Sequence, residues 1–297
     1  TVDGSAATDS LTINTSGLVS STAYSTGSGD DVFTVGSRLN EGDSFDGGSH
    51  GALASSGDLL TATITSNTVI TDAFTIANVE TVELTNGGAA FVDAAAITGT
   101  TSIETAGSSA TKLTYANLGA NHSVGLGHKD EGGAANAGTT VLVLADETGT
   151  SDSVDVWGYE MATHTLTATA IETVNLKASA TDTTITNSAY TLSGLNATTV
   201  NVSGANKDVD HTLGLGTLDT ETTTLDATAY RGILTVQGSA SATTFSTHGT
   251  AVADITGGAA ADTFNIGSTA AAQNVDGGAG TDTLNMTLSG STSADDM

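Results

Sequence analysis

The stretch Gly277-Gly-Ala-Gly-Thr-Asp-Thr-Leu-Asn285 decides the fold. It matches the nonapeptide repeat G-G-x-G-x-D-x-U-x, where U is a large apolar residue, at every specified position. Its glycines allow a tight turn that directs carbonyl oxygens inward. Asp282 adds a carboxylate, and Leu284 begins a short strand that enters the core. Because Ca²⁺ takes roughly six to eight oxygen ligands, the stretch predicts a calcium-binding turn at the edge of a parallel β-roll.

A near-complete copy, Gly257-Gly-Ala-Ala-Ala-Asp-Thr-Phe-Asn265, lies upstream and lacks only the fourth glycine. Asp262 and Asp282 are 20 residues apart, close to the two nonapeptides of one β-roll coil. We therefore expect both aspartates on one edge, one coil apart, with an ion shared between them. The candidate ligands at this end are Gly257, Asp262, Asp276, Gly277, Gly280 and Asp282.

Similar turns occur near the start of the chain. Gly27-Ser-Gly-Asp-Asp-Val-Phe33 lacks the first glycine, and a looser copy ends at Asp9. A further copy is interrupted, because Phe45-Asp-Gly-Gly48 begins a turn that resumes only at Gly57. The candidate ligands here are Asp9, Gly27, Gly29, Asp31, Asp46 and Asp58. Metal-free Gly-Asp hairpin turns are the alternative, but stacked like charges repel unless a cation lies between them.

The charge of the chain points in the same direction. Six Lys and Arg residues face 33 Asp and Glu residues, for a formal net charge of -27. Such a polyanion repels nucleic acids and anionic membranes. A solvated acidic surface of the kind found in salt-adapted proteins is one explanation, and bound divalent cations are the other. The Gly-Asp motifs favour the cations. Cysteine is absent, which excludes disulfides, zinc–thiolate sites and a catalytic thiol.

Short runs of alternating apolar and polar residues, separated by Gly, Ser, Asn and Asp, predict an all-β protein with many brief strands. There is no proline, so Gly, Asn and Asp must form the turns. No stretch approaches the roughly 20 apolar residues of a membrane span. We expect short helices only within 72–77, 93–97 and 115–118.

The middle of the chain contains a weaker repeat, x-h-E-T-h-x-h, where h is aliphatic. Its third position falls at Glu80, Glu104, Glu172, Thr198 and Thr222. Steps of about 24–26 residues suit one coil of a parallel β-solenoid. A Thr-rich β-sandwich remains open for this region. We divide the chain into a β-roll segment at 1–66, a Thr/Ala-rich repeat region at 67–230 and a second β-roll segment at 231–297.

We expect no enzyme activity. The motifs His-Glu-x-x-His and Gly-x-Ser-x-Gly are absent, and the six histidines are dispersed. Six basic residues offer no constellation for a polysaccharide lyase. Asp152 and Asp155, near Trp157 and Tyr159, could form a sugar-binding patch, although Trp157 and Tyr159 are better explained as a cover over an edge of the β core.

These turns resemble the RTX (repeats-in-toxin) proteins of Gram-negative bacteria. Combined with the Thr/Ala/Gly-rich strands, they resemble the RTX-type surface-layer proteins of Caulobacter and its relatives. The resemblance implies several calcium ions held by turn carbonyls and aspartates, folding outside the cell, type I secretion and self-assembly into a lattice on the cell surface. It also implies an anchor to lipopolysaccharide through a region outside this chain.

The sequence departs from that family in two respects. Its nonapeptides are few and scattered, and no secretion segment follows Leu288. We expect from the start at Thr1 that the chain is a processed piece, a fragment or a substrate of a pathway that reads a C-terminal signal. The stalk of an RTX adhesin is an alternative function. The accessory module of a secreted polysaccharide-modifying enzyme is a weaker one.

Overall fold

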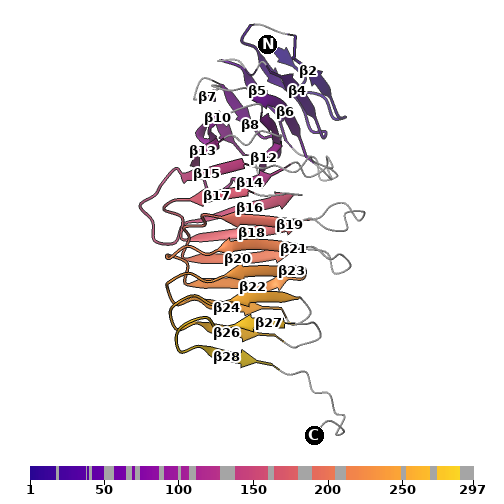
Figure 1. Ribbon diagram of the computed structural model, residues 1–297. Coiled ribbons are helices and arrows are strands. Elements are labelled where there is room, and N and C mark those ends of the chain that lie inside the picture. The colour runs from indigo at the N-terminus through magenta and orange to yellow at the C-terminus, as the bar shows by residue number, and fades with distance from the viewer. Residues whose placement is uncertain are drawn as a thin grey trace, which may run out of the picture.

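Short strands follow one another around successive coils, and each pairs in parallel with the equivalent strand of the next coil (Figure 1). The computed structural model describes residues 1–17, 20–37, 39, 42–49, 57–64, 69–70, 74–86, 90–99, 102–106, 112–127, 138–159, 164–179, 189–204, 212–248, 252–267 and 273–287. The first and last coils lie at opposite ends of the stack. The all-β solenoid expected from the alternation is confirmed.

One sheet runs the length of the molecule and contains 13 strands. In spatial order they are β2 (Thr12–Asn14), β4 (Val32–Gly36), β6 (Leu59–Ile64), β9 (Thr81–Asn86), β12 (Ser102–Ala106), β14 (Ser123–Leu126), β16 (Ser153–Tyr159), β18 (Thr173–Ser179), β20 (Thr199–Gly204), β22 (Thr224–Tyr230), β24 (Thr244–Thr247), β26 (Thr263–Ile266) and β28 (Thr283–Met286). Every pairing in it is parallel, for example Thr263 with Thr283.

Two shorter parallel sheets complete the solenoid. The five-stranded sheet contains β1 (Val2–Asp3), β3 (Ala23–Ser25), β5 (Ser44–Asp46), β8 (Thr75–Ala77) and β11 (Ile97–Thr98). The ten-stranded sheet contains β7 (Val69–Ile70), β10 (Ala90–Asp93), β13 (Lys112–Leu118), β15 (Gly138–Leu144), β17 (His164–Ala168), β19 (Ala189–Ser193), β21 (Thr212–Thr217), β23 (Ile233–Gln237), β25 (Ala253–Thr256) and β27 (Gln273–Asp276). The coils that contain β7 and β10 contribute a strand to all three sheets.

The coils differ in length because their loops differ. Strand partners are 19 residues apart at Thr244 and Thr263, and 32 residues apart at Ser123 and Asp155. The uniform step predicted for the middle is therefore wrong in part. Thr173 pairs with Thr199, as the step from Glu172 to Thr198 requires. Glu104, however, is in register with Glu83 and not with Glu80. The Thr198 carbonyl accepts the Thr223 N–H, so the predicted match of Thr198 with Thr222 is also wrong by one residue.

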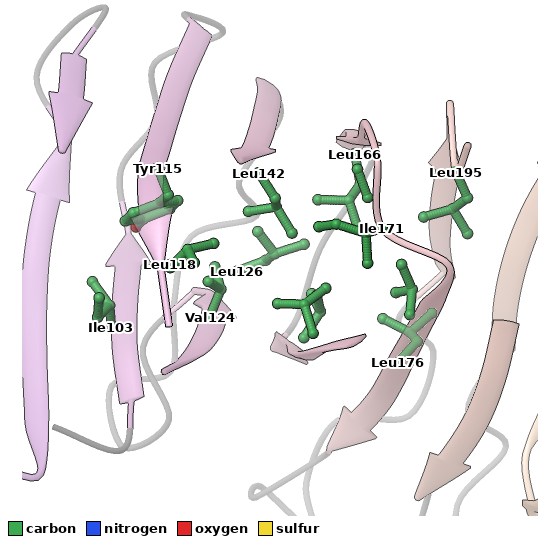
Figure 2. Packing of buried hydrophobic residues seen from close by; sticks show 14 of the residues in the cluster. Ile103, Tyr115, Leu118, Val124, Leu126, Leu142, Leu166, Ile171, Leu176 and Leu195 are labelled. Carbon is green, nitrogen blue, oxygen red and sulfur yellow. The ribbon is translucent and has the colours of Figure 1, made fainter. Parts of the chain in front are cut away.

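The core is one continuous column of inward side chains that extends from Tyr24 to Ile266. In the middle coils it is almost entirely aliphatic, with residues such as Leu142 of the ten-stranded sheet and Leu176 of the 13-stranded sheet among its side chains (Figure 2). Aromatic rings stack towards the two ends. The ring centroids of Tyr24 and Phe45 are 5.2 Å apart, and those of Phe245 and Phe264 are 5.1 Å apart. Stacked rings of this kind suit in-register parallel strands.

The described middle region is part of the same parallel solenoid, so a β-sandwich is excluded there. The 13-stranded sheet continues across both predicted segment boundaries, through β6–β9 and β22–β24. The division into three segments therefore stays a prediction. Of the predicted short helices, one is confirmed as the 3₁₀ helix η1 (Ala94–Ala96), which Asp93 caps. The other two are wrong where described, because β8 and β13 occupy those positions.

Candidate cation-binding edge

Ten of the twelve predicted ligands lie on one edge of the solenoid, which we call the turn edge, and the other two, Asp46 and Asp276, end the strands that lead into it. It consists of the turns through which the chain passes from the five- or ten-stranded sheet into the 13-stranded sheet. The relevant turns are residues 4–11, 26–31, 47–49 with 57–58, 257–262 and 277–282. The solenoid thus aligns motifs from both ends of the sequence along the same side of the molecule, in two groups separated by the middle coils.

The glycines of these turns stack directly on one another. Near the start, a Cβ at Gly27 would overlap the carbonyl oxygen of Ala7, and one at Gly48 would overlap that of Gly27. The turns are joined by main-chain hydrogen bonds, with Ser28 N–H to the Ala7 oxygen at 3.0 Å and Ser49 N–H to the Gly27 oxygen at 3.1 Å. Only glycine allows this approach, which confirms that the motif glycines are required by geometry.

The far end repeats the arrangement. A Cβ at Gly258 would overlap the carbonyl oxygen of Ser239, and one at Gly278 would lie 2.5 Å from that of Gly258. Ala259 N–H donates to the Ser239 oxygen at 3.1 Å, as at the other end. Gly280 has φ of 130°, a conformation that a side chain would strain. Main-chain carbonyls are therefore concentrated where the motif predicted calcium ligands.

A ladder of carboxylates runs beside the first group of glycines. Asp31 Oδ1 accepts the Leu11 N–H at 2.7 Å, and Asp58 Oδ1 accepts the Asp31 N–H at 2.7 Å. Glu80 Oε2 accepts the Asp58 N–H at 2.9 Å. Each acid thus accepts the N–H of the residue directly before a strand of the 13-stranded sheet in the preceding coil, a position that we call the strand entrance. Stacking of the coils brings three like charges onto neighbouring rungs.

This ladder contains carboxylate oxygens for which the described residues provide no hydrogen-bond donor. Asp31 is fully buried, at 0% exposure. Its Oδ2 and the buried Oδ1 of the adjacent Asp30 have no hydrogen-bond partner among the described residues. An isolated buried carboxylate costs several kcal/mol unless a cation or donors compensate it. The orphaned oxygens, together with the stacked turn carbonyls, fit a hard cation.

The second group brings Asp262 and Asp282 together, one coil apart as expected. Asp282 Oδ1 accepts the Asp262 N–H at 2.9 Å. The buried Asp262 uses both oxygens, taking the Thr243 N–H at 2.8 Å and the Gly258 N–H at 2.7 Å. The motifs of Asp262 and Asp31 each lack one glycine, yet both oxygens of Asp262 have hydrogen-bond donors and Oδ2 of Asp31 has none among the described residues.

Three of the predicted ligands lie apart from the ladder. Asp46 Oδ1 accepts the Gly48 N–H and the Asn78 Nδ2, and Asp276 Oδ1 accepts the Gly278 N–H at 3.0 Å. Both therefore close their own turns. Asp9 is exposed and lies two residues before Leu11, whose N–H is the one that Asp31 caps. Asp31 with Asp58 and Asp262 with Asp282 are the pairs that the fold joins.

Several residues with the same role were missed in the sequence. Asp30 contributes an orphaned oxygen, and Glu80 and Glu172 cap the strand entrances of the preceding coils, the latter at 2.9 Å from Asp152 N. The doubled Asp at 30–31 was a usable signal. The two glutamates belong to the x-h-E-T-h-x-h repeat, which marks the same strand entrance as the Gly-Asp motif, and that equivalence was not evident from the letters alone.

Within the described ranges, no three His, Cys, Asp or Glu side chains form a preformed metal-binding group. A cation held at the turn edge would draw on backbone oxygens as well as carboxylates, because the stacked glycines bring carbonyls together there. The residues that would hold it are Asp30, Asp31, Asp58 and the carbonyls of the Ala7–Gly27–Gly48 stack, with Asp262, Asp282 and their glycine turns at the other end.

Two other surface features lie outside the turn edge. Trp157 lies on the outer face of the 13-stranded sheet, where the Lys177 Nζ sits 4.7 Å from its ring centroid and is paired with Asp155 at 2.6 Å. A depression of about 440 Å³ over β21, β23 and β25 is lined mainly by Gly and Thr. Its carboxylate, Asp254, already accepts the Asn274 Nδ2 at 2.9 Å. The first feature thus contains a single ion pair, and the carboxylate of the second is already hydrogen-bonded.

Comparison of the chain with family models, with curated proteins and with solved structures found no match in any of the three. In the part of the chain that the structure describes, no helix is long and apolar enough to cross a membrane.

Proposed function

We propose that this chain is a structural, calcium-stabilised β-solenoid of the outer cell surface, of the surface-layer type, with no enzymatic role. The observation that carries the proposal is the fully buried Asp31, whose Oδ2 lacks a partner beside the equally orphaned Oδ1 of Asp30. Those two oxygens lie on a turn whose carbonyls are already stacked by glycine contacts. A hard divalent cation is the simplest group that compensates them.

Calcium is favoured among cations by ligand chemistry. The turn edge offers carboxylate and carbonyl oxygens, which are the ligands of Ca²⁺, and the chain has no cysteine for softer metals. The sequence carries a net charge of -27, so bound cations would also reduce repulsion between coils. Because the unfolded chain has no preformed site, ion binding adds directly to folding stability.

Folding outside the cell follows from this coupling. Extracellular calcium modules bind at roughly 10⁻⁴–10⁻³ M, far above cytosolic calcium. A chain that depends on such sites would stay unfolded during export and fold at the cell surface, which suits type I secretion. Self-assembly into a lattice, with lipopolysaccharide contacted through a region outside this chain, completes the surface-layer proposal.

The test starts with protein stripped by chelator. Circular dichroism during calcium titration should show cooperative gain of β structure, and Asp31→Asn should raise the calcium concentration required. Magnesium serves as the matched control ion, because its stricter octahedral demand suits this edge poorly. Full β structure and unchanged thermal unfolding in excess chelator would contradict the proposal.

Electron microscopy then separates the functional classes. Ordered two-dimensional arrays with calcium support the surface-layer function. Folded particles that bind a glycan without forming arrays would support an adhesin stalk, and sugar turnover would support the accessory module of an enzyme.

A further inference from the structure

A hollow lies on the outer face of the ten-stranded sheet, over β21, β23 and β25. Strand β21 alternates leucine with glycine, and its leucines are buried in the core. Gly214 and Gly216 therefore occupy outward positions, because successive residues of a strand point to opposite faces of the sheet. In the next two strands, the positions in register with Gly214 carry Thr235 and Asp254. The bare backbone of β21 thus forms the floor of a depression of about 440 Å³.

Only one of these two glycines is required by its backbone conformation. Gly216 has φ of 64°, and the pairing with β23 shifts register between Gly214 and Gly216, as at a β-bulge. The φ of Gly214 is not positive, and this residue pairs in register with Thr235. A glycine inside a strand lowers stability, and it often marks a place where a ligand approaches the backbone closely. Gly214 therefore indicates a surface that is kept open.

The sides of the hollow carry hydroxyl, amide and carboxylate groups. Besides the buried Val236, the described residues that form them are Thr217, Thr235, Gln237, Asp254 and Thr256. Thr217 Oγ1 donates to Gln237 Oε1 at 3.1 Å, which leaves the Gln237 amide nitrogen to donate elsewhere. Asp254 Oδ1 accepts the Asn274 Nδ2 at 2.9 Å, which leaves Asp254 Oδ2 to accept elsewhere. The hollow thus offers both a donor and a charged acceptor.

This lining selects a class of ligand. Among the described residues of the hollow there is no Lys, Arg or His, and the chain carries a net charge of -27, so a phosphate or a sugar acid would be repelled. Val236 is the one large apolar residue there, which offers little surface for an apolar ligand. Hydroxyl groups both donate and accept hydrogen bonds, so a hydroxyl-rich neutral ligand matches the mixed donors and acceptors. The volume lies within the range of roughly 300–1,000 Å³ of small-molecule sites.

We infer that this hollow binds a neutral sugar with hydroxyl groups on adjacent carbons. The two hydroxyls donate to the Asp254 carboxylate, the Gln237 amide donates to a sugar oxygen, and the C–H face of the ring rests on Gly214. No aromatic ring among the described lining residues stacks on the sugar, so binding at one hollow is weak. The site goes beyond the proposed function, because none of its residues is a candidate cation ligand.

Saturation-transfer difference NMR suits such weak binding and uses the folded full chain in calcium. The probes are methyl α-mannopyranoside, methyl β-galactopyranoside and methyl β-glucopyranoside, with sodium glucuronate as the anionic control. At least one of the three neutral glycosides should show saturation transfer. Glucuronate should show none, because its carboxylate is repelled by Asp254 and by the acidic surface.

Two variants locate the binding. Gly214→Thr fills the floor and should abolish the signal, while the thermal unfolding midpoint stays the same or rises, because threonine suits a strand and pairs with Thr235. Asp254→Asn replaces a charged acceptor with a neutral one and should weaken binding by about tenfold. The matched control, Asp226→Asn in the 13-stranded sheet, should leave binding unchanged.

Three results would overturn the sugar site. The first is a folded chain that shows no saturation transfer to any of the three glycosides. The second is transfer that survives both Gly214→Thr and Asp254→Asn, which would place the sugar elsewhere. The third is glucuronate bound as well as the neutral sugars. Circular dichroism measures calcium-dependent folding separately, so the sugar site and the proposed function can each fail without the other.

Discussion

The ends and the middle of the solenoid solve the same problem with different side chains. Where the chain enters the 13-stranded sheet, a side chain forms a hydrogen bond to the main chain of the neighbouring coil, either as an acceptor or as a donor. At the ends the acceptor is an aspartate, as at Asp31 and Asp282. In the later middle coils a threonine occupies the position, and its hydroxyl instead donates to a main-chain carbonyl of the preceding coil, from Thr198 to Glu172 at 2.9 Å and from Thr223 to Thr198 at 3.3 Å.

This difference separates two sources of stability. A threonine satisfies the backbone without adding charge, so the coils around Thr198 and Thr223 stack without counter-ions. Stacked aspartates accept main-chain N–H groups but accumulate negative charge beside one another. The same turns require glycine columns, and the nearby cores contain stacked rings such as Phe245 on Phe264. The ends should therefore depend on calcium, and the middle should not.

The largest loss of stability is expected where the turn glycines stack on the preceding coil. Gly258→Ala would place a methyl group against the Ser239 carbonyl and force two turns apart. We expect a loss of about 3 kcal/mol in the free energy of unfolding, measured by denaturant titration in calcium. In the middle, Gly158 has open space around it, so Gly158→Ala should change stability by no more than about 1 kcal/mol, and in the favourable direction. Equal losses of stability in the two variants would contradict the proposed difference between the ends and the middle.

Asp31→Asn should change stability with opposite signs in calcium and in chelator. The amide keeps an acceptor for the Leu11 N–H but removes the buried charge. In calcium the variant should lose about 2 kcal/mol, and in chelator it should be more stable than the parent. Thermal unfolding under both conditions measures this. Glu172→Gln, a middle-coil control that also keeps its acceptor, should show no such reversal.

A smaller, calcium-independent loss is expected from Thr243→Val. The Thr243 hydroxyl is buried and donates to the Thr222 carbonyl at 3.1 Å. Replacing it with a methyl group removes one neutral hydrogen bond, for a cost of about 1 kcal/mol. Chemical unfolding with and without calcium should give the same difference. A loss confined to calcium would show that this rung belongs to the ion-dependent part.

The smallest effect concerns acid stability on the outer face of the middle. Burial acts to raise the pKa of Asp155, but hydrogen bonds from Lys177 and Asn175 and the charge of Lys177 hold it below its ordinary value. A depressed folded-state pKa contributes stability that is present above the unfolded pKa, near 4, and is lost as pH falls through the folded value. Lys177→Met should reduce the loss of unfolding free energy on acidification by a few tenths of a kcal/mol, because the ion pair is partly exposed. Urea titrations at several pH values measure this.

Much of the edge could be predicted because it depends on local rules. The glycine pattern and the spacing of Asp262 and Asp282 follow from turn geometry and coil length, and the structure joins those residues as expected. The register of Glu104 could not be predicted, because loops of unequal length separate the coils. The strand at Tyr115 also differs from the expected helix, since pairing with β10 and β15 overrides local preference.

The orphaned oxygens of Asp30 and Asp31 were also beyond sequence reasoning. Their importance comes from burial and from the absence of a donor among the described residues, which are properties of packed coils. The sequence motif ranked the far end as the better site, whereas the unsatisfied carboxylates lie at Asp30 and Asp31.

Hydrogen exchange with mass spectrometry, with calcium and then with excess chelator, tests the central claim most directly. The account predicts that chelation removes amide protection from the end coils, residues 23–64 and 253–287, while residues 189–230 remain protected. Equal protection of ends and middle in chelator would contradict it.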